Sequence, residues 1–357
     1  MKRRLFVVLP QKRPPYEIEM ITRFHRFEPS ILWSARNGLK VLGRSVPWRR
    51  ILKIESLERL GIMKNLQCIT DASLIVTLEL HSPESFLVSK CCPELQHVVL
   101  VWETLKNHPY YFLPPIGFQS RYVSKNADHF IAFTHKSEAH LLSLGIDRSK
   151  ISVIYPGIDL TKFRPAYHQG NSGKVRFLYA GVLDRHKGLD FLLRAFRRSS
   201  NPNFELLIAG RGPLEKLARS HAAEDDRIKI LGWVPHKEMH RVFQESDVYC
   251  CPSVDSRLFF WKHGEEQFGF SIVEAMGSGL PIVSTSCGAI PEVVGSQNLI
   301  VRQGAISSIL HALERIGGDS LLRSRLGSEN RSRAERLFEL EKQSSSLETE
   351  LIRISGN

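Results

Sequence analysis

The second half of the chain alternates between short apolar runs and stretches with helical periodicity. The apolar runs predict buried strands, and the stretches between them repeat apolar residues at helical spacing. The predicted strands are Val175–Ala180, Phe204–Ala209, Ile228–Leu231, Val248–Cys251 and Pro281–Ser284, and the predicted helices are Leu189–Arg197, Leu214–Ala222, Lys237–Glu245 and Ser271–Gly277. Strands that alternate with helices indicate βαβ units and a parallel sheet, which binds ligands at the carboxyl ends of its strands.

The first half repeats this alternation less clearly. Its predicted strands are Leu5–Leu9, Leu74–Leu78, Val98–Val101 and His129–Phe133, and its predicted helices are Trp48–Gly61 and Ser137–Leu144. The segment from Ile154 to Gly173 is rich in Pro, Gly and polar residues, so we expect it to link two domains. Two doubly wound domains would leave a cleft between facing strand ends, where a nucleotide-linked substrate would bind.

Composition supports this picture and excludes several classes of protein. The 357 residues are 42% hydrophobic and 24% charged, which excludes intrinsic disorder, collagen and small disulfide scaffolds. The six cysteines lack zinc-ligand spacing, so we interpret them as reduced, buried thiols of a cytoplasmic protein. The apolar run Leu5–Leu9 is too short for a signal peptide, and no run approaches the roughly 20 residues that span a bilayer.

The positive charge is concentrated near the beginning of the chain. The net charge is +12, and residues 1–58 contain 13 basic and five acidic side chains. Such asymmetry favours an anionic partner. Within Pro47–Lys53, Trp48 and two aliphatic residues stand beside cations, as in a peripheral helix on anionic lipid. A solvated basic face with Trp48 in the core remains an equal alternative.

Two glycine turns follow the first two strands of the second half. Gly181–Gly188 contains Arg185 and Lys187, and Gly210-Arg211-Gly212-Pro213 places Pro where a helix would begin. Glycine turns that open helices offer N–H groups to a phosphate, while Lys or Arg neutralises its charge. A turn of this kind by itself is more often an ordinary connection between a strand and a helix than a ligand site.

The strongest motif begins with two glutamates separated by seven residues. Glu266 precedes a helix that is predicted to start near Gly269, and Glu274 lies on its second turn. A carboxylate beside free amides can accept sugar hydroxyls while those amides hold a phosphate, and the second can hold a ribose diol. The alternative is a helix with an acidic first turn and a surface Glu.

This motif, followed by Gly-x-Pro-Ile-Val, resembles the signature of the retaining glycosyltransferases of family 4, which have the GT-B fold. The resemblance covers about half of the chain in the expected order. Its segments are Ile151–Pro165, Gly181–Gly188, Gly210–Pro213, Leu231–Pro235, Ser246–Ser253, Glu266–Met276 and Gly288–Val294.

The resemblance implies two Rossmann-like doubly wound α/β domains that face each other across a cleft. Residues 1–165 would bind the acceptor, residues 166–334 would bind a nucleoside diphosphate sugar, and the helix in 335–357 would cross back to the first domain. No metal or other cofactor is expected.

The same resemblance implies roles for individual residues. Glu266 would bind sugar hydroxyls, Glu274 the ribose and Lys187 the diphosphate, and we expect Glu266 and Lys187 to be catalytic together with Glu103. The remaining donor-binding residues would be Gly181, Arg185, Gly210, Arg211, Gly212, Trp233, Val234, Gln267, Phe268, Gly269, Phe270, Ser271 and Ile272.

Three positions depart from the family pattern. Val182 stands where the family usually has Arg, so we expect Arg185 in the same loop to substitute. The glycine pair that usually opens the first βα turn is absent after Leu9. Glu103 aligns with a position that is usually His, and we expect it at a strand end facing the donor sugar. Glu79 and His81 are weaker candidates for the same neighbourhood.

The sequence therefore predicts a retaining hexosyltransferase (EC 2.4) that uses a UDP- or GDP-sugar and a hydroxyl acceptor on a lipid, glycan or small molecule. We expect it in the cytoplasm, with residues 1–58 available to an anionic membrane. One rival is a catalytically idle relative that binds a nucleotide sugar. Another is a basic nucleic-acid-binding protein, suggested by aromatic residues among the early cations but by no recognised motif.

Overall fold

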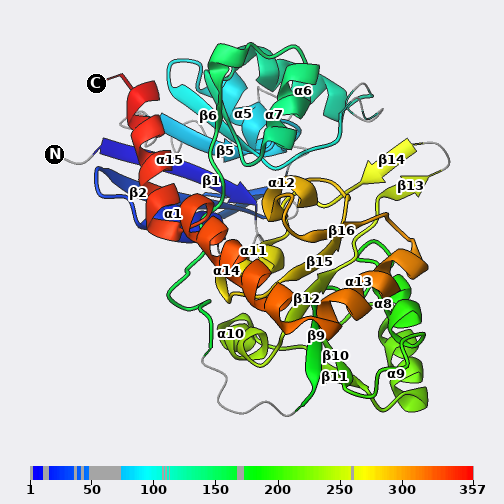
Figure 1. Ribbon diagram of the computed structural model, residues 1–357. Coiled ribbons are helices and arrows are strands. Elements are labelled where there is room, and N and C mark those ends of the chain that lie inside the picture. Colours follow the sequence, from blue (N-terminus) through cyan, green and yellow to red (C-terminus); the bar gives the residue numbers. More distant parts are fainter. Residues whose placement is uncertain are drawn as a thin grey trace. The chain divides into compact units, whose positions relative to one another are not determined.

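The computed structural model describes residues 3–10, 16–35, 38–41, 44–47, 74–106, 108, 111, 113–166, 173–258 and 261–356. The chain forms two compact units (Figure 1). The first unit consists of Met1–Gly157 and Leu340–Asn357, and the second is Ile158–Glu339.

The first unit contains an eight-stranded sheet in the order β4-β3-β2-β1-β5-β6-β7-β8. Its strands are β1 (Arg3–Pro10), β2 (Phe27–Ala35), β3 (Gly38–Val41), β4 (Arg44–Pro47), β5 (Leu74–Leu78), β6 (Gln96–Val101), β7 (His129–Ala132) and β8 (Ile151–Val153). From β2 to β8 the neighbouring strands are parallel, whereas β3 and β4 pair antiparallel at one edge. The helices are α1 (Tyr16–Thr22), α5 (Pro83–Cys91), α6 (Ile116–Asn126), α7 (His135–Ser143), the 3₁₀ turn η3 (Arg148–Lys150) and α15 (Leu340–Ile354).

The second unit contains a six-stranded parallel sheet in the order β11-β10-β9-β12-β15-β16. Its strands are β9 (Val175–Ala180), β10 (Phe204–Ala209), β11 (Ile228–Gly232), β12 (Val248–Cys251), β15 (Ile282–Thr285) and β16 (Leu299–Val301). The helices are α8 (Leu189–Phe196), α9 (Glu215–Glu224), α10 (His236–Gln244), α11 (Phe270–Gly277), α12 (Ile290–Val294), α13 (Ile306–Gly318) and α14 (Ser320–Leu337). The strand order reverses between β9 and β12, and doubly wound sheets bind ligands at such a switch point.

The strands of this sheet follow from their sequence because both faces are covered. All six residues of β10 and all four of β12 and β15 are buried. A parallel strand covered on both faces reads as a continuous apolar run, which explains why the sequence predicts β9, β10 and β12 with the bounds observed.

The predicted domain boundaries of 165/166 and 334/335 both fall inside the second unit. Residues 158–165 pack on this unit rather than forming a free linker, because the Arg331 guanidinium donates to the carbonyls of Leu160 and Phe163 at 3.2 and 2.9 Å. At the other end α14 continues to Leu337, so the C-terminal segment that joins the first unit starts at Leu340.

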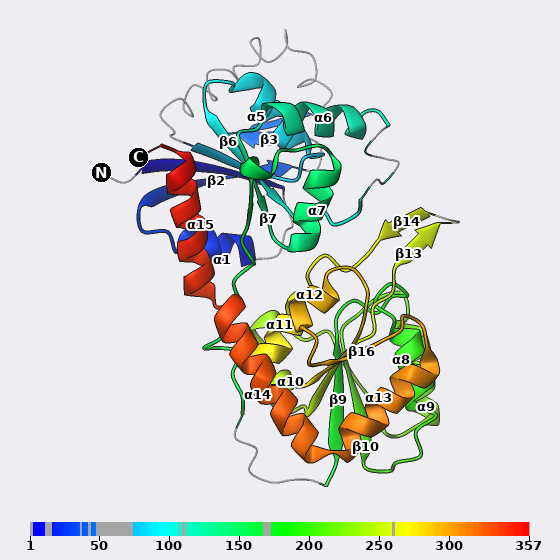
Figure 2. The same ribbon diagram turned by 45° about the horizontal axis from the view of Figure 1, so that its top comes forward.

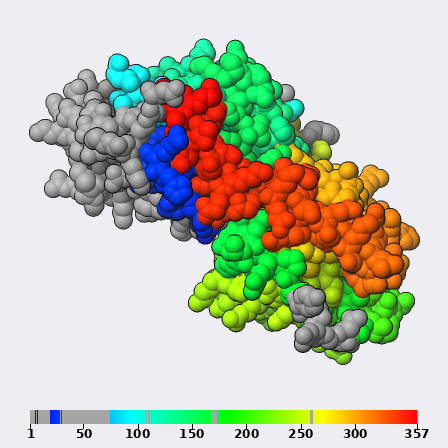
Figure 3. Space-filling model, turned by 60° about the vertical axis from the view of Figure 1, so that its left-hand side comes forward, coloured from blue at the N-terminus to red at the C-terminus, as the bar shows by residue number. Residues whose placement is uncertain are grey.

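Helix α15 lies beside α1 within the first unit (Figure 3). The Ser344 hydroxyl donates to the carbonyl of Met20 at 2.6 Å. The Glu348 carboxylate accepts the amides of Arg26 and Phe27 at 2.5 and 3.2 Å. The last helix therefore completes the first unit.

Two predictions for the first half lie outside the described residues. These are the helix Trp48–Gly61 and the peripheral helix within Pro47–Lys53, of which only Pro47 is described. Among the described residues no helix is long and apolar enough to span a bilayer. The five cysteines that the structure describes are all free thiols.

Candidate functional site

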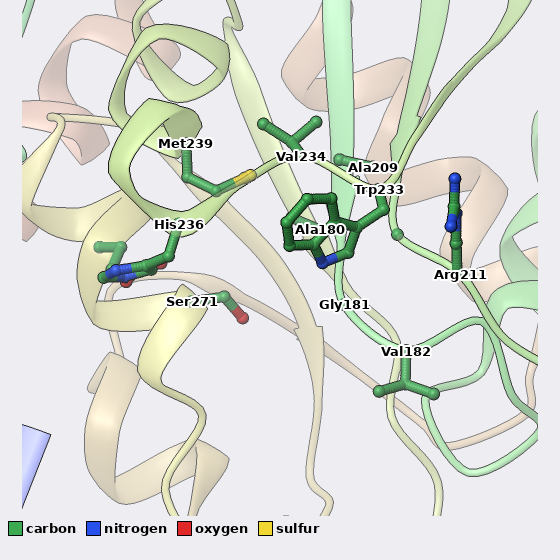
Figure 4. A pocket seen from close by; sticks show the side chains of 12 residues that line it. Ala180, Gly181, Val182, Ala209, Arg211, Trp233, Val234, His236, Met239 and Ser271 are labelled. Carbon is green, nitrogen blue, oxygen red and sulfur yellow. The ribbon is translucent and has the colours of Figure 1, made fainter. Parts of the chain in front are cut away.

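The carboxyl ends of β9, β10 and β11 surround a pocket of about 420 Å³ in the second unit (Figure 4). Parallel strands end at the same sheet edge, so the turns after successive strands meet there. The lining residues are Ala180, Gly181, Val182, Ala209, Gly210, Arg211, Trp233, Val234, His236, Met239, Ser271 and Glu274. Seven of these residues are predicted donor-binding residues.

The glycine turns after β9 and β10 lie directly against each other. Gly210 has a φ of +144°, and a Cβ at this position would lie 1.8 Å from the carbonyl oxygen of Gly181. The amide of Leu183 donates to the carbonyl of Arg211 at 3.0 Å, which ties the two turns together. Glycine at 210 is therefore required for the close approach that forms this side of the pocket.

The indole of Trp233 is an exposed aromatic surface in the lining of this pocket. It is 60% exposed. In Figure 4 Met239 and His236 lie on one side of the indole, and Arg211 and Val182 lie on the other. An exposed aromatic ring beside a cation suits a planar, anionic ligand such as a nucleotide.

The second motif carboxylate, Glu274, is buried at one side of the pocket. Its Oε1 lies 2.7 Å from Nε2 of His236, the first residue of α10. A buried carboxylate needs such a partner. The pair presents a polar edge to the pocket opposite Arg211.

Lys187 and Glu266 form an ion pair beside a smaller adjoining cavity of about 40 Å³. The Lys187 ammonium lies 2.9 and 2.7 Å from the two carboxylate oxygens of Glu266. The hydroxyl of Ser253 donates to Oε2 of Glu266 at 3.1 Å. Asp184 holds the loop in place by accepting the amide of Lys187 at 2.7 Å.

The surroundings keep Lys187 positively charged. Burial by itself would lower the pKa of this ammonium, but the neighbouring Glu266 carboxylate, together with the Asp184 carboxylate, outweighs that effect and raises the pKa. Burial and Glu266 raise the pKa of the Cys251 thiol to about 11, so this thiol stays neutral. The site thus contains a fixed cation and carboxylate with a neutral thiol beside them.

Helix α11 begins at the boundary of the two cavities. Its N-cap, Gly269, has a φ of +82°, and the amide of Ile272 donates to the Gly269 carbonyl at 2.9 Å. The Ile272 amide therefore already has an acceptor in the first turn. The hydroxyl of Ser271 lines both cavities and lies 2.7 Å from the hydroxyl of Tyr249.

Several predicted residues lie outside the two cavities among the described residues. Arg185 is exposed, and Gly212 packs against the backbone of Leu183. The Phe268 ring is buried against Phe270 and Phe338, so its side chain belongs to the core. The proposed roles of these residues, and of Gln267, stay predictions.

Glu103 lies in the first unit, two residues beyond β6. Its Oε1 accepts the amides of Thr104 and Leu105, both at 2.8 Å. The nearby His140 is buried, and its Nδ1 donates to the Leu105 carbonyl at 2.6 Å. Burial lowers the pKa of His140, with Glu103 opposing that shift. Glu103 follows a strand end, as expected, and its role towards a sugar stays a prediction.

Sequence reasoning missed four polar or polarisable residues of the site. His236 and Met239 lie on one face of α10, three residues apart, but that spacing is ordinary for a surface helix. Tyr249 lies within the apolar run that predicts β12, so the sequence gives no sign that it belongs to the site. Ser253 follows β12 at the switch point, and its position two residues after the strand is a signal that could have indicated it.

Comparison with known proteins agrees with this geometry. Residues 82–162 match the model described as Glycosyltransferase Family 4, and residues 174–319 match the model described as Glycosyl transferases group 1. Over these two segments the chain is similar to the family 4 glycosyltransferases. The two matches fall in the first and second units respectively.

Curated relatives of this chain include enzymes from plants and bacteria. The chain is 25% identical over 295 residues to a phosphatidylinositol N-acetylglucosaminyltransferase subunit from Arabidopsis thaliana, covering 78% of this chain and 62% of the relative. It is 32% identical over 164 residues to the amylovoran biosynthesis glycosyltransferase AmsK of Erwinia amylovora, covering 43% and 38%. The chain thus spans less than two thirds of the length of these relatives.

Solved structures establish the GT-B fold. Anabaena Alr3699/HepE in complex with UDP has a TM-score of 0.76 and 16% identity, covering 98% of this chain and 99% of that chain. A glycosyltransferase from Rickettsia africae ESF-5 has a TM-score of 0.75 and 16% identity, covering 100% and 99%.

No cluster of three or more His, Cys, Asp or Glu residues suited to a metal ion occurs within the described ranges. Metal independence of this chain remains an expectation.

Proposed function

We propose that the chain is a retaining glycosyltransferase that moves a hexose from a UDP- or GDP-sugar to a hydroxyl of a lipid, glycan or small molecule. The donor occupies the pocket of the second unit, and the acceptor binds to the first unit. The ion pair of half-buried Lys187 with buried Glu266, beside the smaller cavity that adjoins the 420 Å³ pocket, carries this proposal. A nucleotide in complex with the Anabaena neighbour supports the donor class.

The pocket suits the nucleoside, and the diphosphate and sugar would extend from it past the smaller cavity towards Lys187 and Glu266. Trp233 and Arg211 flank the base, and Glu274 accepts the ribose hydroxyls. The amides at the start of α11 and the Lys187 ammonium hold the diphosphate, because helix N-termini and cations both stabilise phosphate charge.

Donor binding changes the partners of Glu266. A carboxylate accepts about four hydrogen bonds, and Lys187 and Ser253 supply three of those seen here. When a phosphate attracts the Lys187 ammonium, one or both of its hydrogen bonds to Glu266 are released. Sugar hydroxyls then take the vacant acceptor sites.

The chemical step breaks the bond between the anomeric carbon and the phosphate oxygen. Negative charge develops on the leaving diphosphate, and Lys187 and the α11 N-terminus are aimed at it, which we expect to be the largest catalytic effect. The acceptor oxygen attacks on the same face, and its proton passes to the leaving phosphate. The configuration is retained without a second carboxylate, unlike in retaining hydrolases. Glu103 stabilises the positive anomeric carbon.

The test is a donor screen with UDP-, GDP- and ADP-sugars that measures thermal stabilisation and release of free nucleoside diphosphate. Binding of the correct donor raises the melting temperature by mass action. Glu266→Ala should retain the fold and lose roughly 10²–10³-fold in turnover, as expected for one preorganised polar group. Unchanged turnover in the folded variant would remove the donor-site assignment. Stabilisation without turnover by the wild type would indicate an idle relative.

A further inference from the structure

His236 and Glu274, two residues that line the donor pocket, are in direct contact with each other. His236 is the first residue of α10 and Glu274 lies on α11, and these helices are neighbours in the second unit (Figure 2). The Nε2 atom of His236 lies 2.7 Å from Oε1 of Glu274. The contact therefore forms part of the pocket wall, whereas the proposed function gives a role to the carboxylate alone.

The hydrogen bond between these side chains has one direction. An ionised carboxylate only accepts hydrogen bonds, so His236 donates through Nε2. Both the neutral tautomer with its hydrogen on Nε2 and the imidazolium can donate in this way. Because a carboxylate accepts about four hydrogen bonds, the contact with His236 fixes the orientation of the Glu274 carboxylate and still allows it to accept hydroxyls.

The two side chains differ in their exposure. The side chain of Glu274 is 4% exposed, and that of His236 is 42% exposed. Burying a carboxylate is costly unless it is hydrogen-bonded, and ordering a glutamate side chain costs conformational entropy. His236 offsets both costs before a ligand arrives, so the carboxylate is already oriented at the pocket wall.

His236 is itself held in place from the side away from Glu274. Its ring centroid lies 5.8 Å from that of the buried Phe163, and its carbonyl lies 3.4 Å from the Lys162 ammonium. The Arg331 guanidinium donates to the carbonyl of Phe163 at 2.9 Å and to that of Gly277, the last residue of α11, at 2.6 Å. One side chain thus ties the support of His236 to the helix that carries Glu274.

We propose that His236 is a positioning residue that holds the Glu274 carboxylate towards the ribose hydroxyls of the donor and thereby makes the pocket prefer ribonucleotides. The 2′- and 3′-hydroxyls are adjacent donors, which one carboxylate can accept together. An acceptor that is already oriented loses less conformational freedom when the ligand binds, so more of the hydrogen-bond energy appears as affinity. This role rests on the proposed function, because it requires a nucleotide in the pocket.

The test compares the binding of UDP and GDP with that of their 2′,3′-dideoxy counterparts by titration calorimetry on the full chain. The ratio of the two affinities is the ribose preference. The wild type should prefer the ribonucleotide by about tenfold to a hundredfold, as expected for hydrogen bonds to a charged group.

Two substitutions of His236 separate its N–H from its ring. His236→Phe keeps a ring against Phe163 and removes the donor, so it should lower the ribose preference by about threefold to tenfold and hardly change dideoxynucleotide binding. His236→Gln loses the ring and keeps an N–H donor, so it should retain most of the preference. A residue that only packs on Phe163 would give the opposite order.

The matched control is His240→Phe, because His240 follows one turn later on α10 and is not among the residues that line the pocket. It should show the ribose preference of the wild type. In a Glu274→Gln background, His236→Phe should lower the preference no further, since His236 acts through that carboxylate. Thermal unfolding checks that each variant is folded.

A wild-type ribose preference in folded His236→Phe, or equal losses in His236→Phe and His236→Gln, would overturn the positioning role. If UDP or GDP binds and the wild type shows no ribose preference, the roles of His236 and Glu274 fail and the donor pocket stands. If neither nucleotide binds to the wild type, the donor pocket of the proposed function fails, and the positioning role fails with it.

Discussion

At the residue scale, the site depends on a half-buried cation, Lys187, whose charge is maintained by its neighbours. Burial alone favours the neutral form of Lys187, and Glu266, the largest opposing influence, reverses that preference. The exposed Arg185, two residues earlier, has no comparable environment. Two cations in one loop are therefore expected to differ in function.

Lys187→Ala should weaken nucleoside diphosphate binding about tenfold to a hundredfold, because it removes charge-assisted hydrogen bonds to phosphate. Arg185→Ala is the matched control in the same loop and should change binding less. Titration calorimetry with UDP and GDP measures both, and thermal unfolding checks that each variant is folded. A larger loss of nucleoside diphosphate binding in Arg185→Ala than in Lys187→Ala would show that Arg185 is the main phosphate-binding cation.

A second residue-scale prediction concerns His97 in the first unit. Burial lowers its pKa to about 3, and its ring nitrogens contact Thr77 and Ser89 hydroxyls at 2.7 and 3.0 Å. Above pH 6.5 the ring is neutral in both folded and unfolded chains. As the pH falls from 6.5 towards 3, only the unfolded chain takes up the proton, so stability falls by about 1.4 kcal/mol per pH unit.

Urea unfolding at pH 7, 6 and 5 measures this dependence. His97→Gln is expected to be less stable at pH 7, since the ring's packing and one of its hydrogen bonds are lost. It should also show a shallower decline at low pH than the wild type. Parallel declines in the two proteins would contradict the assignment.

At the element scale, the loop that contains Glu266 depends on the turn between β15 and α12. Gly288 in this turn has a φ of +55°, and a Cβ there would lie 1.9 Å from the carbonyl oxygen of Glu266. That carbonyl also accepts the amide of Ala289 at 2.7 Å. A backbone contact this close leaves no room for a side chain.

Gly288→Ala should displace the Glu266 loop, destabilise the chain by about 1–3 kcal/mol and greatly reduce turnover. Gly318→Ala is the control, because a Cβ there meets nothing within 4 Å. Thermal unfolding and donor turnover measure both variants. Wild-type turnover in Gly288→Ala would show that the loop tolerates the shift.

At the scale of the whole molecule, the chain returns to its first unit after the second is complete. The last helix supplies acceptors that the first unit lacks, since Glu348 accepts two backbone amides beside the buried Phe27. The C-terminal segment is thus a structural part of the first unit.

Glu348→Ala should destabilise the first unit by about 1–3 kcal/mol, because amides at a largely buried position lose their acceptor. Glu341→Ala removes a carboxylate of the same helix that pairs with the exposed Arg23, and should cost less than about 1 kcal/mol. Denaturant unfolding compares the two. Equal losses of stability in the two variants would mean that the Glu348 carboxylate is not needed as a hydrogen-bond acceptor.

The local pattern of apolar residues was sufficient to predict the strands that are largely buried. Apolar runs of neighbouring residues predict strands β9, β10 and β12. The spacing of neighbouring residues likewise reveals the two-glutamate motif and the glycine turns. The predicted GT-B fold follows from the same motifs by resemblance. Strands β2, β3 and β4 and the hairpin of β13 (Ser256–Leu258) and β14 (Trp261–Gly264) were not predicted. Polar residues and Pro29 interrupt β2, and the other four strands are only three or four residues long, so none has a continuous apolar run.

Only the tertiary structure decided which polar groups meet. Lys187 and Glu266 are 79 residues apart, and His236 and Glu274 are 38 apart, so no sequence periodicity connects them. Their contacts arise because parallel strands end at one edge and bring distant turns together. The boundaries between units were likewise set by the contacts of Arg331 and α15 rather than by local composition, because packing decides which unit a polar segment joins.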